Sequence, residues 1–326
     1  MDKESAIDEF TRLDEFSRPS ASLIKSVLLN RDVPLYLQLR ALYFCRDLPI
    51  EDATQILISA FEVHFDTFMR HEIAYVIGQS GCVNAAKRLS ELVEDASEDP
   101  MVRHEAIEAL AALKSTNFID LIRRFSKDHC RAVRDTCTLA LHSLESTGSA
   151  NICGCTSAPL SNSAYRAIDP IPLESSDYSD SSDLESLSNA LFNQELPIYK
   201  RYEALYKIRA ISGDEAAKII GDALVMDKVS EVFRHECAFV LGQMQSTSAV
   251  ESLIECLKNE DEEPMARHEA ALALGSCGCI DPDNECTKKI VEALEKYSND
   301  KVKVVSDSCV VAIDYINESR EAVMAN

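Results

Sequence analysis

Apolar residues recur along most of this chain with the period of an amphipathic helix, and they predict helices joined by short polar turns. The segments AAKRLSELVED (85–95) and AVESLIECLKN (249–259) each place their aliphatic residues on one face of a helix. A few polar residues later, each is followed by a second segment rich in small and aliphatic residues, such as HEAIEAL (104–110). The pattern therefore predicts a protein built from pairs of helices.

The chain also repeats itself over a long distance. Residues 68–111 align with residues 232–275 without a gap, at a constant offset of 164. Within this stretch, FMRHEIAYVIGQ (68–79) matches VFRHECAFVLGQ (232–243), and DPMVRHEAIEAL (99–110) matches EPMARHEAALAL (263–274). Upstream, LNRDVPLYLQLRALY (29–43) matches FNQELPIYKRYEALY (192–206) at an offset of 163, and downstream VRDTCTLAL (133–141) resembles VSDSCVVAI (305–313). The sequence thus consists of two homologous halves, and each half contains four shorter units.

Successive units begin 30 to 38 residues apart, which is typical of HEAT-like repeats. We therefore expect an all-α fold, an α-solenoid of eight HEAT-like helical hairpins in two halves related by a pseudo-twofold axis. Pro100 and Pro264 fit the first turn of a helix, so we expect His104 and His268 to lie near the start of the second helix of their hairpins.

A segment without helical periodicity separates the halves. Residues 146–183 are rich in Ser, Asp, Pro and Gly and predict a flexible or partly extended linker, with an acidic, Ser-rich end at 174–183. The predicted division is a four-repeat half at 1–145, the linker at 146–183, and a second four-repeat half at 184–326.

Charge and composition narrow the possible functions. With 33 basic and 55 acidic residues, the net charge is −22, which disfavours binding to nucleic acid and favours a cationic substrate or a basic partner. The sequence contains no GxGxxG and no GxxxxGK[ST] motif, so neither a dinucleotide fingerprint nor a P-loop is expected. The charged start MDKESAIDEF and the lack of an 18-residue apolar run predict neither a signal peptide nor a membrane span.

The twelve cysteines are expected to be reduced thiols of a cytoplasmic protein, with the nucleus as a second possible compartment. Two Cys-x-Cys pairs occur, at Cys153/Cys155 and Cys277/Cys279. Because neither has a second pair at zinc-finger spacing, buried or incidental thiols are favoured over a zinc site.

Four of the seven histidines form Arg-His-Glu triplets. They are His71, His104, His235 and His268, and their acidic neighbours are Glu72, Glu105, Glu236 and Glu269. Composition alone predicts about one His-acid pair in a chain of this kind. The first and fourth units of each half keep the helical pattern without a His-Glu pair, as at Leu39-Arg40 and Arg134-Asp135. The scaffold therefore does not require the pairs, which indicates a function.

The spacing of these pairs suggests a metal centre. Inner helices of neighbouring units stack roughly 8–10 Å apart, which brings the two His-Glu pairs of a half side by side. If the halves face each other across the pseudo-twofold axis, all eight side chains converge on one cleft. Imidazoles and carboxylates without thiolates suit two Fe or Mn ions better than Zn.

This arrangement resembles the deoxyhypusine hydroxylase family, whose members are HEAT-repeat di-iron monooxygenases that complete hypusine on translation initiation factor 5A. The resemblance rests on the two four-unit halves, on the His-Glu pairs 33 residues apart within each half, and on the linker segment AIDPIP (167–172). It covers nearly the whole chain.

The resemblance implies a ligand set and a reaction. His71, His104 and Glu105 would bind one Fe²⁺, and His235, His268 and Glu269 would bind the other. Glu72 and Glu236 would then be catalytic groups that face the substrate or support the ligands. The implied reaction is O2-dependent hydroxylation of deoxyhypusine on translation initiation factor 5A, with O2 as co-substrate and an external electron donor.

Two other classes of function compete with this hypothesis. A metallohydrolase with two Mn or Zn ions would need a phosphate- or peptide-binding group, and the arginines of the triplets are better explained as structural ion pairs. A metal-free HEAT scaffold would bind other proteins through its concave face, and it predicts that the histidines can be replaced without loss of binding.

Overall fold

The computed structural model describes residues 3–13, 17–146, 167–171, 173 and 184–325, and every regular element in them is helical. The α-helices are α1 (Lys3–Thr11), α2 (Ala21–Leu28), α3 (Leu35–Phe44), α4 (Ile50–Val63), α5 (Thr67–Ser80), α6 (Ala86–Glu94), α7 (Pro100–Ala112), α8 (Ile119–Phe125), α9 (Arg131–Ser146), α10 (Leu184–Phe192), α11 (Ile198–Ile211), α12 (Gly213–Met226), α13 (Glu231–Met244), α14 (Val250–Lys258), α15 (Pro264–Gly278), α16 (Glu285–Tyr297) and α17 (Lys303–Ala325). Short 3-10 turns lie at Cys45–Asp47, Val83–Ala85, Thr116–Phe118 and Thr247–Ala249. The all-α prediction is confirmed.

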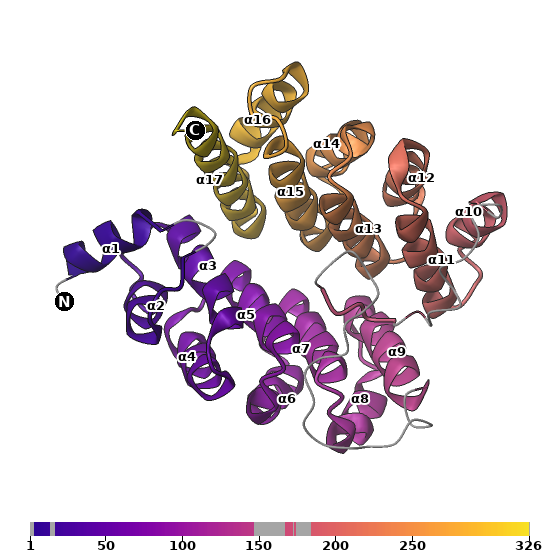
Figure 1. Cartoon of the computed structure of the whole chain (residues 1–326). Helices are drawn as coiled ribbons and strands as arrows, with labels where there is room; N and C mark the ends of the chain where they lie inside the picture. The colour runs from indigo at the N-terminus through magenta and orange to yellow at the C-terminus, as the bar shows by residue number, and fades with distance from the viewer. Residues whose placement is uncertain (1–2, 14–16, 147–166, 172, 174–183, 326) are drawn as a thin grey trace. The chain divides into compact units, whose positions relative to one another are not determined.

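The helices α2 to α17 form the eight predicted hairpins, and α1 precedes the first of them (Figure 1). The described helices divide into two compact units, α1 to α9 and α10 to α17. Within the first unit the inner helices α3, α5, α7 and α9 pack in succession, and within the second α11, α13, α15 and α17 do the same. The expected boundaries of the halves and their pseudo-twofold relation stay predictions.

Amphipathic outer helices and small residues on the inner helices explain this packing. In α6, Leu89, Leu92 and Val93 are buried, whereas Lys87 and Glu91 on the opposite face are exposed. The inner helices approach closely where a glycine faces an alanine. A Cβ added to Gly78 on α5 would lie 2.9 Å from the Cα of Ala109 on α7. Each buried face thus meets the next hairpin, as a repeat architecture requires.

The predicted linker falls mostly outside the described residues, and so does its acidic, Ser-rich end. Residues 167–170 group with the first unit. Gln79 of α5 holds this stretch, because its side-chain Oε1 accepts from the backbone N–H of Ile168 at 2.7 Å and its Nε2 donates to the carbonyl of Ile168 at 3.3 Å. This part of the linker therefore has a defined contact with a helix that carries a His-Glu pair.

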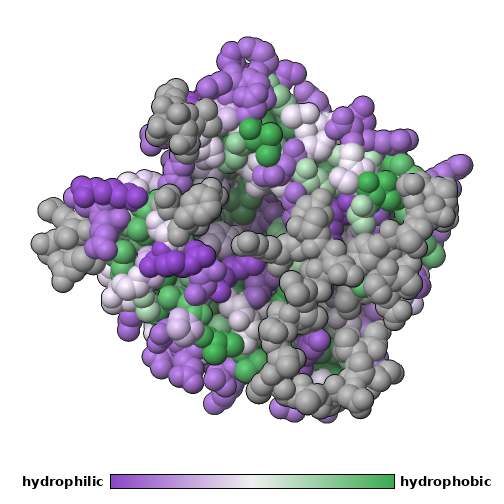
Figure 2. Space-filling model, in the orientation of Figure 1, coloured by the Kyte–Doolittle hydropathy of each residue, from purple (hydrophilic) through white to green (hydrophobic). Residues whose placement is uncertain are grey.

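Hydrophilic side chains cover much of the face drawn in Figure 2. Among the described helices, we find none that combines the length and the apolar composition needed to cross a bilayer.

Candidate metal centre

Each of the four His-Glu pairs occupies the same place in its helix. Every one of the four histidines is the fifth residue of an inner helix, on α5, α7, α13 and α15. Local capping explains this register. Asp66 accepts from the N–H of Met69 at the start of α5, Asp99 accepts from the N–H of Met101 at the start of α7, and Pro264 is the first residue of α15. The prediction that the pairs lie near helix starts is confirmed.

In the first unit, His71, His104 and Glu105 come together. Their ligand atoms lie within 4.8 Å of one another, and all three side chains are buried. The His71 Nε2 is 3.3 Å and the His104 Nε2 is 3.8 Å from the Glu105 Oε2, so both rings turn a nitrogen toward the same carboxylate oxygen. The two rings are nearly parallel, with centroids 6.4 Å apart. Neighbouring repeats thus build a two-imidazole, one-carboxylate set.

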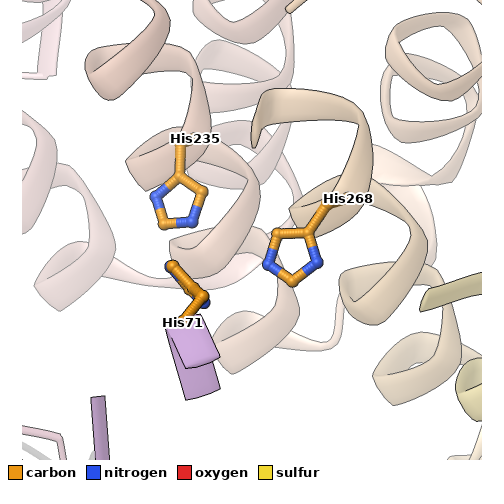
Figure 3. Close-up of side chains that lie close together, drawn as sticks. All are labelled: His71, His235 and His268. Carbon is orange, nitrogen blue, oxygen red and sulfur yellow. The ribbon is translucent and has the colours of Figure 1, made fainter. Parts of the chain in front are cut away.

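The second unit repeats this arrangement. The Nε2 atoms of His235 and His268 each lie 3.6 Å from the Oε2 of Glu269. The rings are stacked with their centroids 6.1 Å apart, and Figure 3 shows them side by side on neighbouring helices. Because both units turn two Nε2 atoms toward one carboxylate oxygen, each set can be compared with the other as an internal control.

The remaining two acids, Glu72 and Glu236, are also buried, and a tyrosine holds each of them. The Tyr43 hydroxyl donates to Glu72 Oε2 at 2.7 Å, and the Tyr206 hydroxyl donates to Glu236 Oε1 at 2.8 Å. In the first unit, Glu72 Oε1 also lies 3.2 Å from the Nδ1 of His71. Glu72 therefore supports a histidine of the set while its oxygens keep acceptor capacity for another donor.

A hydroxyl group contacts the histidine of the third repeat in each half. The Nδ1 of His104 lies 2.6 Å from the Thr136 hydroxyl, and the Nδ1 of His268 lies 2.8 Å from the Ser308 hydroxyl. In the first unit, Glu108 adds a further carboxylate, 3.9 Å from the His104 Nε2, and Leu272 stands at the matching position of the second unit.

Sequence reasoning did not single out these hydroxyls, the tyrosines or Glu108. For the hydroxyls and the tyrosines the available signal was repetition: Tyr43 aligns with Tyr206, and Thr136 with Ser308, in segments that recur between the halves. Glu108 has no such counterpart, because Leu272 stands at its matching position.

Burial and neighbouring charges act strongly on the first set. Burial lowers the pKa of His71, but the hydrogen bonds and charges of Glu105 and Glu72 outweigh it and raise that pKa to about 10. Burial and the nearby His71 lower the pKa of His104 to about 3. The carboxylates of Glu105 and Glu72 thus favour a positive charge beside them, which is the charge that a metal ion would supply.

The arginines of the triplets serve a structural purpose, as predicted. Arg103 donates to the carbonyl of Val93 at 3.1 Å and to Asp128 at 2.7 Å. Arg267 makes the matching contacts with the carbonyl of Leu257 and with Asp300. Arg70 and Arg234 also pair with acidic residues. These guanidinium groups fix the inner helices to loops, and their ion pairs leave them poorly suited to bind a phosphate.

The isolated histidines and the cysteines behave differently from the triplets. His64 is buried and its Nε2 contacts the carbonyl of Leu28 at 2.8 Å, as expected of a core histidine. In the described part of the chain, Cys277 and Cys279 join no group of three metal-ligating side chains, and burial raises the pKa of Cys277 to about 12. Cys153 and Cys155 lie outside the described residues.

The donor chemistry of each set fits a divalent transition-metal ion. Two imidazole nitrogens and one carboxylate oxygen are the donors of known sites for iron, and they leave coordination positions open for other ligands. The neighbours of His71, His104 and His268 also fit, because ligating histidines commonly direct the second ring nitrogen to a carboxylate or another oxygen.

Comparisons with known proteins agree with the fold. A family model described as HEAT repeats matches residues 222–313. The deoxyhypusine hydroxylase of Danio rerio is 33% identical over 296 residues, covering 90% of this chain and 90% of that protein. That of Mus musculus is 34% identical over 295 residues, covering 89% of each chain.

The solved structure of human deoxyhypusine hydroxylase in complex with glycerol superposes with a TM-score of 0.80 at 30% identity, over 97% of this chain and 98% of that one. These relatives match the chain over nearly its whole length, and the solved structure shares its fold. The chain therefore belongs to the deoxyhypusine hydroxylase family of enzymes.

Proposed function

We propose that this protein is a di-iron monooxygenase that hydroxylates the deoxyhypusine side chain of translation initiation factor 5A to hypusine. The observation that carries the proposal is the buried set of two histidines and one glutamate, built in the same way in each half. The family of the chain supplies the substrate class, and the ligand chemistry supports iron.

In this proposal, His71, His104 and Glu105 would hold one Fe²⁺, and His235, His268 and Glu269 would hold the other. The irons supply the activation of O2, the co-substrate. One oxygen atom enters a C–H bond of the substrate as a hydroxyl group, and the other leaves as water with two electrons and two protons from an external donor. The burial of the two sets excludes bulk water from this chemistry.

Glu72 and Glu236 are proposed to receive the substrate. Deoxyhypusine is a lysine extended by an aminobutyl group, so it carries a secondary and a primary ammonium on a long apolar stem. A carboxylate held by a tyrosine hydroxyl presents a fixed acceptor for such an ammonium. The net charge of −22 also favours the approach of a cationic side chain over that of a nucleic acid. We expect this reaction to take place in the cytoplasm.

The first test is metal content together with activity. The full chain, purified without oxygen and loaded with Fe²⁺, should hold about two irons and hydroxylate a factor that bears deoxyhypusine. His71→Ala and His235→Ala should each lower the iron content and abolish turnover, whereas His64→Ala, in a buried histidine away from the sets, should keep both iron ions. A fully active protein that contains zinc and lacks iron would contradict the proposal, and so would full activity without metal.

The second test separates ligands from substrate contacts. Glu105→Gln and Glu269→Gln should lose iron and activity together, because each removes the only carboxylate among the three proposed ligands of its half. Glu72→Gln and Glu236→Gln should keep much of their iron and lose turnover. Equal loss of iron in all four variants would show that the division between ligand and substrate contact is wrong.

A further inference from the structure

The fourth repeat of each half carries no His-Glu pair, yet it contacts the histidine of the third repeat. Thr136 on α9 and Ser308 on α17 directly follow Asp135 and Asp307, the residues that stand where the second and third repeats have Glu. Both hydroxyl side chains are buried, 1% and 0% exposed. In the third repeats the same position is Ala106 and Ala270, which have no hydroxyl. The fourth repeats thus carry no His-Glu pair and place a hydroxyl group at the next position.

The direction of the hydrogen bonds can be worked out from the helix backbone. The Thr136 hydroxyl donates to the carbonyl of Ala132 at 2.8 Å, and the Ser308 hydroxyl donates to the carbonyl of Val304 at 2.6 Å. A hydroxyl group has only one proton, and in both residues the backbone carbonyl takes it. The hydroxyl oxygen can therefore only accept from the ring nitrogen that faces it.

That nitrogen is the Nδ1 of His104 in one half and of His268 in the other. If Nδ1 carries the proton, the Nε2 of the neutral ring has a free electron pair. This Nε2 is the atom that lies 3.8 Å from Glu105 in the first set and 3.6 Å from Glu269 in the second. The hydroxyl thus determines which nitrogen is able to bind a metal ion.

We propose that Thr136 and Ser308 are positioning residues that hold His104 and His268 in the Nδ1–H tautomer and direct Nε2 of each ring to the metal. This inference rests on the metal site proposed above. It gives the fourth repeats a part in the site, since each supplies an oriented acceptor to the histidine of its neighbour. Oxygen acceptors of this kind typically change metal affinity by about 10- to 100-fold when they are removed.

The first measurement uses the metal-free protein and needs no substitution. Long-range proton–nitrogen correlation spectra of the full chain, labelled at histidine, should show His104 and His268 with the proton on Nδ1. The resonances are assigned with single His→Gln variants. Rings protonated on Nε2 would overturn the proposal even if the protein binds iron. Failure of the wild-type chain to bind iron would instead contradict the proposed function and leave the tautomer result standing.

The second measurement tests the hydroxyls by substitution. Thr136→Val keeps the side-chain shape and removes the hydroxyl, and Ser308→Ala does the same for the other half. Each should weaken Fe²⁺ binding in its half by about 10- to 100-fold, measured by competition with a chelator, and shift the tautomer signal of the facing histidine. The conservative variants Thr136→Ser and Ser308→Thr should restore both readouts.

Thr138→Val is the matched control in the first half. The Thr138 hydroxyl also donates to a carbonyl one turn back, at 3.0 Å, but its side chain is exposed on the opposite face of α9. This variant should leave iron affinity and tautomers unchanged. Unchanged iron affinity in Thr136→Val and Ser308→Ala, or equal losses in Thr136→Ser and Thr136→Val, would overturn the proposal.

Discussion

At the scale of single residues, the two acids of a half have different surroundings although they follow histidine in the same way. Glu105 faces the Nε2 atoms of His71 and His104, whereas Glu72 receives the Tyr43 hydroxyl and lies beside the Nδ1 of His71. The position of Glu105 between two Nε2 atoms supports its proposed part as a metal ligand. The contacts of Glu72 with a hydroxyl and an Nδ1 hold its carboxylate in one orientation, which supports its proposed part in receiving the substrate.

The tyrosines offer a test of that second role. Tyr43→Phe and Tyr206→Phe remove one hydrogen bond to a carboxylate, which is worth about 1.5–3 kcal/mol. Turnover should therefore fall by about 10-fold or more with the iron content unchanged, because the carboxylate loses its fixed orientation while the metal ligands stay in place. Steady-state hydroxylation rates and elemental analysis of the same preparations measure the two effects.

Tyr202→Phe is the matched control for Tyr206→Phe. Tyr202 lies one turn earlier on α11, and its hydroxyl donates to the backbone carbonyl of Val232 at 3.0 Å. Its removal should lower stability and leave turnover of the folded enzyme unchanged. If Tyr202→Phe reduces turnover as much as Tyr206→Phe, the hydrogen bond to Glu236 has no special part in the reaction.

At the scale of helices, buried ion pairs connect the inner helix of each third repeat to the loop that precedes the inner helix of the fourth repeat. Burial raises the pKa of Asp300, but the hydrogen bond and charge of Arg267 and the N–H of Val302 outweigh it, so the pKa lies below its ordinary value of 3.8. The same balance with Arg103 lowers the pKa of Asp128. At pH values between the folded-state pKa and 3.8, the unfolded chain binds more protons at these two aspartates than the folded chain does. The stability that these ion pairs contribute is therefore fully present above pH 3.8, and it is lost as the pH falls through the folded-state pKa.

We expect the free energy of unfolding of the wild-type chain to drop steeply as the pH falls through that window. Asp300→Asn should show a shallower slope there. At neutral pH it should be less stable by about 3 kcal/mol, because Arg267 is left buried and without its countercharge. Denaturant titrations at several pH values measure this. A variant with the wild-type slope would show that the acid sensitivity arises elsewhere.

The spacing between inner helices depends on a glycine seven residues after the first histidine of each half. Gly78 faces Ala109, and Gly242 faces Ala273, where an added Cβ would lie 3.1 Å from the Cα. Elsewhere in a helix, Gly→Ala stabilises by about 0.5–1 kcal/mol. Here Gly78→Ala should instead destabilise by about 1–3 kcal/mol and weaken iron binding, since it forces α5 and α7 apart beneath His71 and His104. A chain that becomes more stable, with unchanged iron affinity, would contradict this explanation.

At the scale of the whole molecule, the sequence was sufficient for the architecture and for locating the residues of the candidate metal centre. Long-range repetition and helical periodicity are properties of many residues at once, so eight hairpins and four His-Glu pairs could be predicted from one chain. The contacts of Thr136, Ser308, Tyr43 and Tyr206 could not. A lone hydroxyl on a helix has several possible hydrogen-bond partners. Which partner it contacts depends on how hairpins about 30 residues apart stack. The helix α1, which precedes the first hairpin, also lies outside the repeat pattern.

Metal binding links these scales, because it should stabilise the folded chain as a whole. An ion that binds only the native state at about 100 times its Kd contributes about 2.7 kcal/mol per site. For units of about 150 residues this corresponds to a rise in Tm of about 5–10 °C. The twelve cysteines can bind metal in the unfolded chain, which reduces the rise in Tm. The melts should therefore be run with only a small excess of Fe²⁺ over the protein and with the thiols kept reduced. The His104→Ala/His268→Ala double variant should show little or no rise, since both proposed sites lose an imidazole. Identical melting temperatures of the wild-type chain with and without saturating Fe²⁺ would contradict preferential binding of the metal to the folded chain, whatever the activity of the preparation.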